Sequence, residues 1–163
     1  MGKESLPSYK EIHTIIFDFD GVFTDNKVFL SQDGQEIIQC DRSDGLGFDI
    51  LRKFKKKYNW KIRYFVLSTE TNKVVKMRCK KLGIDCYQGV TNKLDFLRKK
   101  LQQTINSDPK GIIYLGNDLN DLGIMKYVGW PISPSDAHPI ILSQAKIILP
   151  RKGGYGVVRY LIE

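Results

Sequence analysis

Two acidic residues, Asp18 and Asp20, follow an apolar run near the beginning of the sequence. The run Ile15-Ile16-Phe17 predicts a buried strand. Residues two apart on a strand point the same way, so the two carboxylates should leave the sheet as a pair. Carboxylates beside a buried strand are costly unless a cation or a shared proton compensates their charge. Solvated acids would explain an isolated Asp-x-Asp, but this pair begins the longer pattern Asp-x-Asp-Gly-x-x-Thr-Asp.

Three more groups of polar residues follow later in the chain, and two of them come directly after apolar runs. They are Ser68–Glu70 after Tyr64–Leu67, Lys93 after Gln88–Asn92, and Gly116–Asp121 after Ile112–Leu115. A serine there is most often a helix cap, yet a hydroxyl beside backbone amides also binds phosphate. A lysine in the first turn of a helix opposes the macrodipole, so Lys93 predicts a compensating anion. Because open α/β sheets bind ligands at the carboxyl ends of their strands, the four groups together predict one site.

The length and composition bound the class of protein. A chain of 163 residues predicts a single domain, 1–163, and 42% hydrophobic with 27% charged residues is ordinary for a globular protein. The sequence contains no apolar run long enough to cross a membrane and no apolar core typical of a signal peptide near its start. Three cysteines without a Cys-x-x-Cys pair predict a reducing, cytoplasmic location and no thiolate metal site.

The net charge of +8 leaves two classes of partner open, nucleic acid and small anions. The basic runs Lys53–Lys57 and Arg98–Lys100 lie where helices are expected, interleaved with apolar residues, so a solvated helix face is the preferred explanation. No recognised nucleic-acid-binding motif accompanies the charge. We therefore predict no nucleic-acid partner and no membrane partner, and a small anionic substrate suits the excess of positive charge.

Apolar runs alternate with helical patterns, which predicts an α/β fold with a mostly parallel, doubly wound sheet of the Rossmann type. The expected strands lie near Ile12–Phe19, Ile62–Leu67, Cys86–Tyr87, Ile112–Leu115, Trp130–Ile132 and Ile147–Leu149. The expected helices lie near Gly45–Tyr58, Asn72–Leu82, Asn92–Ile105, Leu119–Val128, Ala137–Leu142 and Tyr155–Leu161.

One insertion interrupts this alternation. Asp33-Gly34 lies between the strand-like runs Lys27–Ser31 and Gln35–Cys40, and Asp-Gly in that context predicts a β-hairpin. The hairpin, about 27–40, follows the acidic loop directly and is expected to project over the site as a flap. The insertion is too short for a separate cap domain. Near the end of the chain, the Gly-rich stretch 151–156 predicts a flexible tail before a terminal helix.

In order and spacing, the four groups resemble the four motifs of the haloacid dehalogenase superfamily, most of whose members are phosphatases. The resemblance spans Ile12 to about Arg159. It implies that Asp18 is the nucleophile, forming an aspartyl-phosphate, and that Asp20 is the general acid and base. It also implies that Ser68 and Lys93 hold the phosphoryl oxygens.

The same resemblance implies a Mg²⁺ site made by Asp18, the Asp20 carbonyl and the fourth motif, and hard oxygen ligands suit that ion. The fourth motif departs from the family pattern. Asn117 stands where the family usually has the metal-binding aspartate, so one negative charge is missing and a lower metal affinity is expected. Asp118 and Asp121 remain as further candidate ligands, directly or through a water.

The chain most resembles the capless sugar-acid phosphatase branch, which acts on 3-deoxy-octulosonate 8-phosphate or 2-keto-3-deoxynonulosonate 9-phosphate. The hairpin and three sequence patterns carry this resemblance, namely Gln88–Lys93, Ala137–Pro139 and Gly153–Gly156. Where octulosonate enzymes usually have Thr-Gly-Arg, this chain has Ser68-Thr69-Glu70, which is similar to the nonulosonate type. The resemblance then implies that Thr69, Glu70, Arg78 and Lys81 bind the substrate.

The sequence therefore predicts a Mg²⁺-dependent phosphatase for a sugar-acid phosphate. The resemblance also implies a homotetramer in which hairpins make the central contact and Arg78, Lys81 or the tail reaches a neighbour's site. Asn117 leaves an alternative open, a weakly active or inactive phosphatase-like domain that assembles with an acylneuraminate cytidylyltransferase. A receiver-type regulator shares the scaffold, but Asp-x-Asp-Gly with the hairpin argues against it. A nucleic-acid 3′-phosphatase would explain the positive charge, but nothing in the sequence indicates a groove that binds a nucleic-acid strand.

Overall fold

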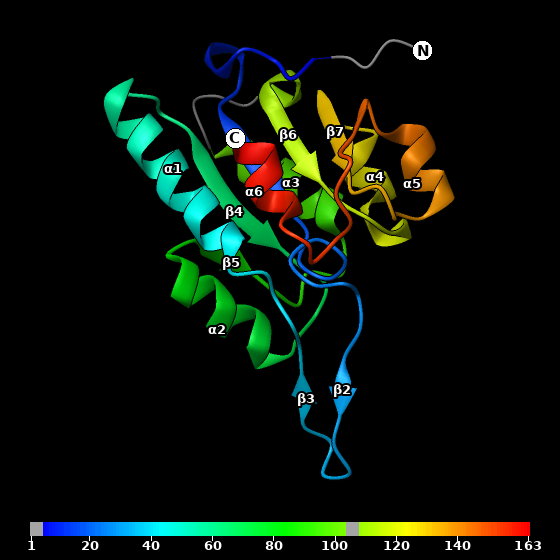
Figure 1. Ribbon diagram of the computed structural model, residues 1–163. Coiled ribbons are helices and arrows are strands. Elements are labelled where there is room, and N and C mark those ends of the chain that lie inside the picture. Colours follow the sequence, from blue (N-terminus) through cyan, green and yellow to red (C-terminus); the bar gives the residue numbers. More distant parts are fainter. Residues whose placement is uncertain (1–4, 104–107) are drawn as a thin grey trace.

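The computed structural model describes residues 5–103 and 108–163. Its centre is a six-stranded sheet in the order β5-β4-β1-β6-β7-β8, and every neighbouring pair is parallel (Figure 1). The strands are β1 (Thr14–Phe17), β4 (Arg63–Leu67), β5 (Asp85–Tyr87), β6 (Ile112–Leu115), β7 (Trp130–Ser133) and β8 (Ile147–Ile148). The predicted parallel α/β sheet is confirmed, with each expected strand present to within a few residues.

Helices cover both faces of this sheet, because the buried central strands are apolar on both sides. The α-helices are α1 (Ser43–Lys57), α2 (Lys73–Leu82), α3 (Lys93–Gln102), α4 (Leu122–Met125), α5 (Pro139–Gln144) and α6 (Val157–Ile162). Short 3₁₀ turns are η1 (Tyr9–Glu11), η2 (Pro109–Gly111) and η3 (Leu119–Asp121). One core contains Phe48 of α1, Val75 of α2 and Leu161 of α6. The other contains Leu97 of α3 and Ile141 of α5, so the fold is doubly wound.

The order of the strands places the predicted site residues at one edge of the sheet. The last residue of β1, Phe17, lies opposite Val66 of β4 and Leu115 of β6. After β1 the chain builds β4 and β5 on one side, and it then crosses to build β6, β7 and β8 on the other. This change of direction is the switch point at which open α/β sheets bind ligands.

One expected helix differs from the structure. The helix expected over Leu119–Val128 is replaced by η3 and the single turn of α4, because Asp118 and Asp121 form a capping box that holds η3 in a tighter turn. The end expected for the third helix, at Ile105, lies outside the described residues. Among the residues that the structure describes, no helix combines the length and apolar character needed to span a bilayer.

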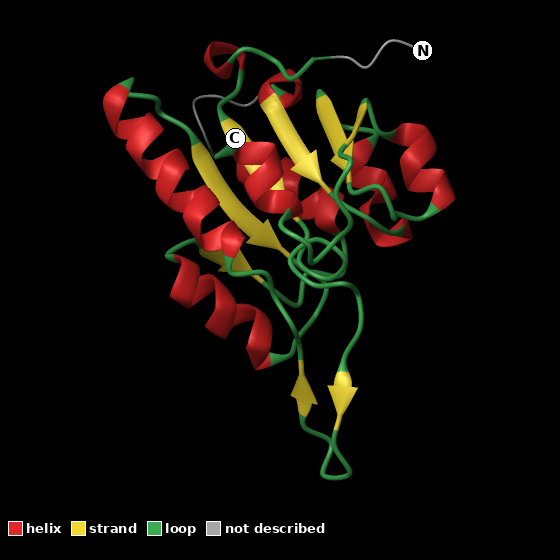
Figure 2. Cartoon of the chain, in the orientation of Figure 1, coloured by secondary structure: helices red, strands yellow, loops and turns green. Residues whose placement is uncertain are grey.

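The predicted hairpin is present but shorter than expected, with the antiparallel strands β2 (Phe29–Leu30) and β3 (Glu36–Ile37). Gly34 turns the chain at φ +76°, a conformation that glycine adopts without strain. The hairpin stands away from the body of the molecule (Figures 1 and 2), so its tip does not lie over the site as a flap. Its apolar side chains are exposed, with Phe29 and Leu30 each 68% accessible.

Candidate active site

A cavity of about 540 Å³ opens at the carboxyl ends of β1, β4 and β6. The loops after these strands form one wall, and the base of the hairpin forms the other. The lining residues are Asp18, Asp20, Ser68, Thr69, Glu70, Val74, Asn117, Asp118 and Asn120, with Asn26, Val28, Glu36 and Ile38 at the hairpin base. The structure therefore brings together most of the site residues that the sequence predicts.

Lys93 lies beneath this cavity between two buried carboxylates. Its Nζ atom is 2.6 Å from Asp18 Oδ1 and 2.7 Å from Asp121 Oδ1, and all three side chains are buried. Burial would lower the pKa of Lys93, but the charges of Asp18 and Asp121 outweigh it and raise this pKa. Burial, together with the charge of Asp121, raises the pKa of Asp18 to about 8 in the absence of a metal ion. With one cation for two carboxylates, the cluster has an excess of negative charge that another cation would relieve.

Asp121 is held by four donors and does not reach the cavity. One oxygen, Oδ1, accepts hydrogen bonds from Lys93 and from the hydroxyl of Tyr114. The other, Oδ2, accepts the backbone N–H groups of Asn117 at 2.9 Å and Asp118 at 3.3 Å. We therefore describe Asp121 as a positioning residue that fixes Lys93 and the loop after β6, although the sequence predicts it as a candidate metal ligand.

Tyr114 belongs to this network, although it is not among the site residues predicted from the sequence. Its fully buried hydroxyl also accepts a hydrogen bond from Lys93 Nζ at 3.2 Å. One signal could have revealed it, because a tyrosine in the aliphatic run Ile112–Leu115 needs a buried partner for its hydroxyl. Side chains alternate along a strand, so Tyr114 points to the same face of β6 as Ile112.

Asp20 is only partly buried and faces the cavity. Burial, followed by the nearby charge of Glu70, raises the pKa of this carboxyl. Thr24 donates its hydroxyl to Asp20 Oδ1 at 3.4 Å and accepts the Gly21 N–H at 3.2 Å, which fixes the acidic loop. A carboxyl with a raised pKa is suited to general acid and base catalysis, the role that the resemblance implies for Asp20.

The loop after β4 presents hydroxyls and one acid. Ser68 is buried, and its Oγ accepts the Glu70 N–H at 3.0 Å. Thr69 Oγ1 accepts a hydrogen bond from Asn120 at 3.3 Å, which joins this loop to the one after β6. The Glu70 carboxylate accepts the backbone N–H groups of Thr71 and Asn72, at 2.7 and 3.0 Å, just before α2. Glu70 thus shapes the start of α2 while it lines the cavity.

The Asn117 amide lies beside the two groups that the resemblance implies as metal ligands, Asp18 and the Asp20 carbonyl. One of its terminal atoms is 3.2 Å from Asp18 Oδ2 and 2.8 Å from the Asp20 carbonyl oxygen. Three donor atoms at such spacing fit Mg²⁺, since neighbouring ligands at 2.0–2.1 Å in an octahedron are about 2.9 Å apart. Among the described residues, no three carboxylates, imidazoles or thiolates gather as a metal site, because the third group here is an amide. Asp118 lines the cavity but accepts the Leu119 N–H at 2.7 Å.

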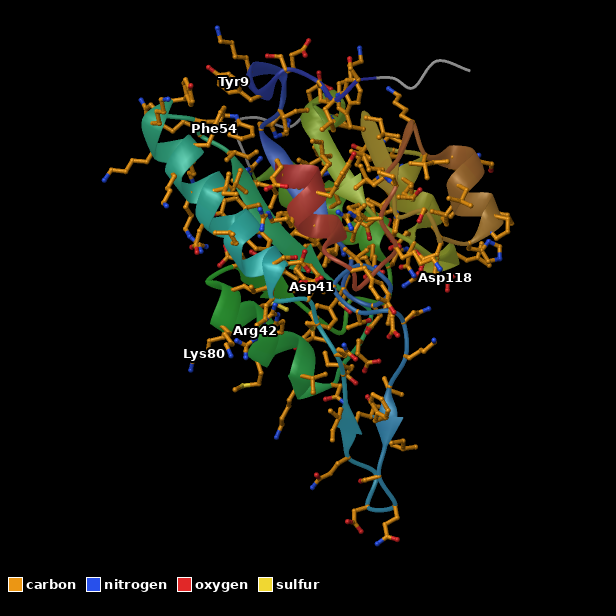
Figure 3. The ribbon with its side chains drawn as sticks, viewed as in Figure 1. Tyr9, Asp41, Arg42, Phe54, Lys80 and Asp118 are labelled. Carbon is orange, nitrogen blue, oxygen red and sulfur yellow. The ribbon has the colours of Figure 1, made fainter. Side chains whose placement is uncertain are left out.

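Arg78 and Lys81, which the sequence predicts as substrate-binding residues, lie in a different cavity. This second cavity, of about 980 Å³, is lined by Arg42 and Lys80 as well, and it shares the side chains of Ile38 and Val74 with the first. Arg78 Nη2 donates to the Asp41 carbonyl at 2.7 Å. Figure 3 shows Arg42 and Lys80 near α2 and apart from Asp118. Within one chain, these cations do not join the acidic cavity.

The Gly-rich tail packs against the acidic loop of its own chain. Gly154 donates its N–H to the Val22 carbonyl at 2.9 Å, and Gly153 donates to Asp136 at 3.0 Å. A Cβ on Gly153 would lie 2.0 Å from the Gly21 carbonyl oxygen, so only glycine fits there. The sequence predicts that this stretch is flexible, and the resemblance implies that it, Arg78 or Lys81 reaches a neighbour's site. In the structure its glycines support the loop that carries Asp20.

Comparison with known proteins places this geometry in a family. The model of the haloacid dehalogenase-like hydrolases matches residues 49–161. The chain belongs to this family. This membership confirms the predicted fold and the prediction that the chain is a phosphoric monoester hydrolase.

Among its relatives is the 3-deoxy-D-manno-octulosonate 8-phosphate phosphatase of Salmonella typhi, 30% identical over 94% of this chain and 79% of that protein. A solved structure from Streptomyces avermitilis, described as a HAD family hydrolase, is 35% identical, with a TM-score of 0.86 over 95% of this chain and 85% of that one. The Moraxella catarrhalis octulosonate phosphatase, solved with magnesium, phosphate and the sugar acid, is 26% identical. Its TM-score is 0.83 over 94% of this chain and 85% of that one.

Proposed function

We propose that this haloacid dehalogenase-like hydrolase is a Mg²⁺-dependent phosphatase whose nucleophile is Asp18. The observation that carries the proposal is the arrangement at the end of β1. Asp18 is buried 2.6 Å from Lys93, while Asp20 is partly exposed with a raised pKa. One carboxylate is thus fixed beside a cation, and the other is suited to moving protons.

In the proposed reaction, an Asp18 oxygen attacks phosphorus and the bond between phosphorus and the ester oxygen breaks. Asp20 gives its proton to the leaving alkoxide. Asp20 then takes a proton from water, whose oxygen attacks the aspartyl-phosphate, releasing phosphate and restoring Asp18. Ser68 and Lys93 hold the phosphoryl oxygens, and when bound by Asp18, the Asp20 carbonyl and Asn117, Mg²⁺ supplies further positive charge to the transition state.

For the substrate we propose the phosphate ester of a 2-keto-3-deoxy sugar acid, either a nonulosonate 9-phosphate or an octulosonate 8-phosphate. The relatives named above are octulosonate 8-phosphate phosphatases. Glu70 and Asn120 offer hydrogen-bond partners for sugar hydroxyls on the wall of the cavity. The cations of the second cavity suit the carboxylate of the substrate, but only if a neighbouring chain supplies them.

A phosphate-release screen over sugar phosphates and sugar-acid phosphates, with Mg²⁺ or with EDTA, tests this proposal. We expect kcat/KM for a 2-keto-3-deoxy sugar-acid phosphate to exceed that for neutral hexose phosphates by about 100-fold or more, because burying an unpaired cation is costly when the carboxylate is missing. EDTA should abolish release. Equal rates on both substrate classes would contradict the sugar-acid assignment.

Asn117 favours a second candidate function. An amide brings no negative charge to the metal, so the chain could be a weakly active or inactive phosphatase-like domain that assembles with an acylneuraminate cytidylyltransferase. The same screen separates the two candidates, because this one predicts negligible release from every phosphate ester at millimolar Mg²⁺. A measurable kcat/KM for one sugar-acid phosphate would exclude it.

We propose that the hairpin assembles four copies of the chain. A two-stranded hairpin is marginally stable alone in water, yet this one exposes Val28, Phe29, Leu30 and Ile37. Phe29 pairs with Ile37 on one face of the hairpin and Leu30 lies on the other face, so the hairpin carries an exposed apolar patch on both sides, and such patches mark an interaction surface. Pairing of hairpins would bury this patch, and it would allow Arg78 and Lys81 of one copy to reach the acidic cavity of another.

Light scattering tests this assembly. We expect the wild type to have the mass of a tetramer, and the double variant Phe29→Lys and Ile37→Lys to lose it, because charged side chains cannot be buried at the interface without partners. The hairpin stands clear of the sheet, so the fold should persist in the variant. The pair Gln32→Lys and Gln35→Lys, with the same added charge at exposed hairpin positions, should remain a tetramer. A fully active wild-type monomer would refute the proposal.

A further inference from the structure

We propose that the Asn117 side chain closes the metal site with hydrogen bonds when no metal is bound, and that its amide must turn over before the site binds Mg²⁺. The inference rests on the metal site of the proposed function and extends it. Asn117 then lowers the affinity of this chain for Mg²⁺ in two ways. Its NH₂ group competes with the metal for the Asp18 carboxylate and the Asp20 carbonyl, and its amide brings no negative charge to the site.

The first observation is the chemistry around the amide. The terminal atom near Asp18 Oδ2 and the Asp20 carbonyl oxygen has only acceptors around it, whereas the other terminal atom has only donors. The structure places the amide oxygen on this side, facing two other oxygens, and turning the amide over satisfies the hydrogen-bonding needs of both terminal atoms. In the turned orientation, the NH₂ group donates to Asp18 Oδ2 at 3.2 Å and to the Asp20 carbonyl at 2.8 Å. These two acceptors are the groups that would hold the metal.

The second observation is that Asn117 has no room to withdraw. The residue is 7% exposed, its N–H donates to Asp121 at 2.9 Å, and its carbonyl accepts the His138 N–H at 2.8 Å. On the other side the amide packs against Gly21, where a Cβ would come within 2.4 Å of Asn117 Cγ. With the backbone fixed, the remaining movement that exchanges donor for acceptor is rotation of the amide about the bond between Cβ and Cγ.

An aspartate at this position would behave differently. Its carboxylate would bring a third acceptor to the Asp18 carboxylate and the Asp20 carbonyl, with no proton between them. The oxygens of these three groups repel one another until a cation binds between them. The metal-free form is therefore destabilised, and the metal is bound more tightly. In the present chain, Mg²⁺ has to displace two hydrogen bonds and gains a neutral ligand.

Thermal unfolding and calorimetric titration with Mg²⁺ alone test the inference without any substrate. In EDTA, Asn117→Asp should unfold at a temperature at least about 3 °C below the wild type. It should also bind Mg²⁺ at least about tenfold more tightly, a difference of about 1.4 kcal/mol. Asn120→Asp is the matched control, because it adds the same charge to the same cavity at a side chain that contacts Thr69. Its unfolding temperature in EDTA should stay within about 1 °C of the wild type.

The amide can also be observed directly in the wild type, which covers the case that Asn117→Asp does not fold. In ¹⁵N NMR spectra in EDTA, the side-chain NH₂ of Asn117 should exchange with water at least tenfold more slowly than that of the exposed Asn59. Mg²⁺ should then shift its signals.

Two results would overturn the inference, namely an Asn117 NH₂ that exchanges as fast as that of Asn59, or equal unfolding temperatures and Mg²⁺ affinities for wild type and Asn117→Asp. Because none of these measurements involves turnover, a failed phosphatase assay would not be mistaken for a failure of this inference.

Discussion

Replacing Asp18 with asparagine is expected to lower the rate of phosphate release by at least about 10⁴-fold. An amide neither attacks phosphorus nor leaves as a carboxylate, so both halves of the proposed reaction lose their covalent step. The loss should appear in kcat. Phosphate release measured on the best substrate of the screen, at saturating Mg²⁺, gives the size of the effect.

The same variant should remain folded, which separates chemistry from stability. Burial raises the pKa of Asp18 to about 8, so its charged form is costly in the metal-free protein, and a neutral amide avoids that cost. Lys93 keeps Asp121 as its partner. Asp85→Asn, an exposed position at the start of β5, is the matched control and should retain wild-type turnover. Turnover by Asp18→Asn in a preparation free of other phosphatases would remove Asp18 as the nucleophile.

Much of the acidic cavity could be predicted from the sequence because its residues follow strands directly. Asp18, Ser68 and Asn117 come after β1, β4 and β6, and parallel neighbours end at the same edge of the sheet. A residue that follows such a strand is placed by the strand itself, so its position needs no knowledge of distant contacts. For this reason, local apolar patterns were sufficient to bring these side chains together.

The sequence could not reveal the network beneath the cavity. Asp121 had the position of a possible metal ligand, but its four hydrogen bonds depend on where Lys93 and Tyr114 lie in three dimensions. The same bonds explain why the chain forms η3 instead of a continuous helix, since Asp121 is drawn inwards. Helix periodicity reports only which side chains are apolar, and it carries no information about a buried carboxylate.

The hairpin and the second cavity show a different limit. Local signals predicted the turn at Gly34, but not that the hairpin would extend away from the sheet. Arg78 and Lys81 matched a substrate-binding pattern, yet within one chain they line a separate cavity. In the proposed assembly both surfaces are completed by a neighbouring copy, and the contacts of such surfaces are not contained in the pattern of a single chain.

Replacing Lys93 with methionine is expected to be the most damaging single change to the fold of the site. It leaves Asp18 and Asp121 buried with no cation between them, and removing one partner of a buried ion pair costs about 3–5 kcal/mol. Phosphate release should also fall by about 10²–10³-fold or more, because a charge that stabilises the transferred phosphoryl group is lost. Thermal unfolding and phosphate release would measure both effects, with the exposed Lys99→Met of the same helix as control.

The double variant Lys93→Met and Asp121→Asn distinguishes the two roles of this lysine. The asparagine removes one of the two uncompensated charges and can still accept the N–H groups of Asn117 and Asp118. The free energy of unfolding should therefore recover by at least about 1–2 kcal/mol relative to Lys93→Met, whereas activity should not recover. If activity returned together with stability, Lys93 would be a structural residue that only compensates charge, and its contact with the phosphoryl oxygens would have to be abandoned.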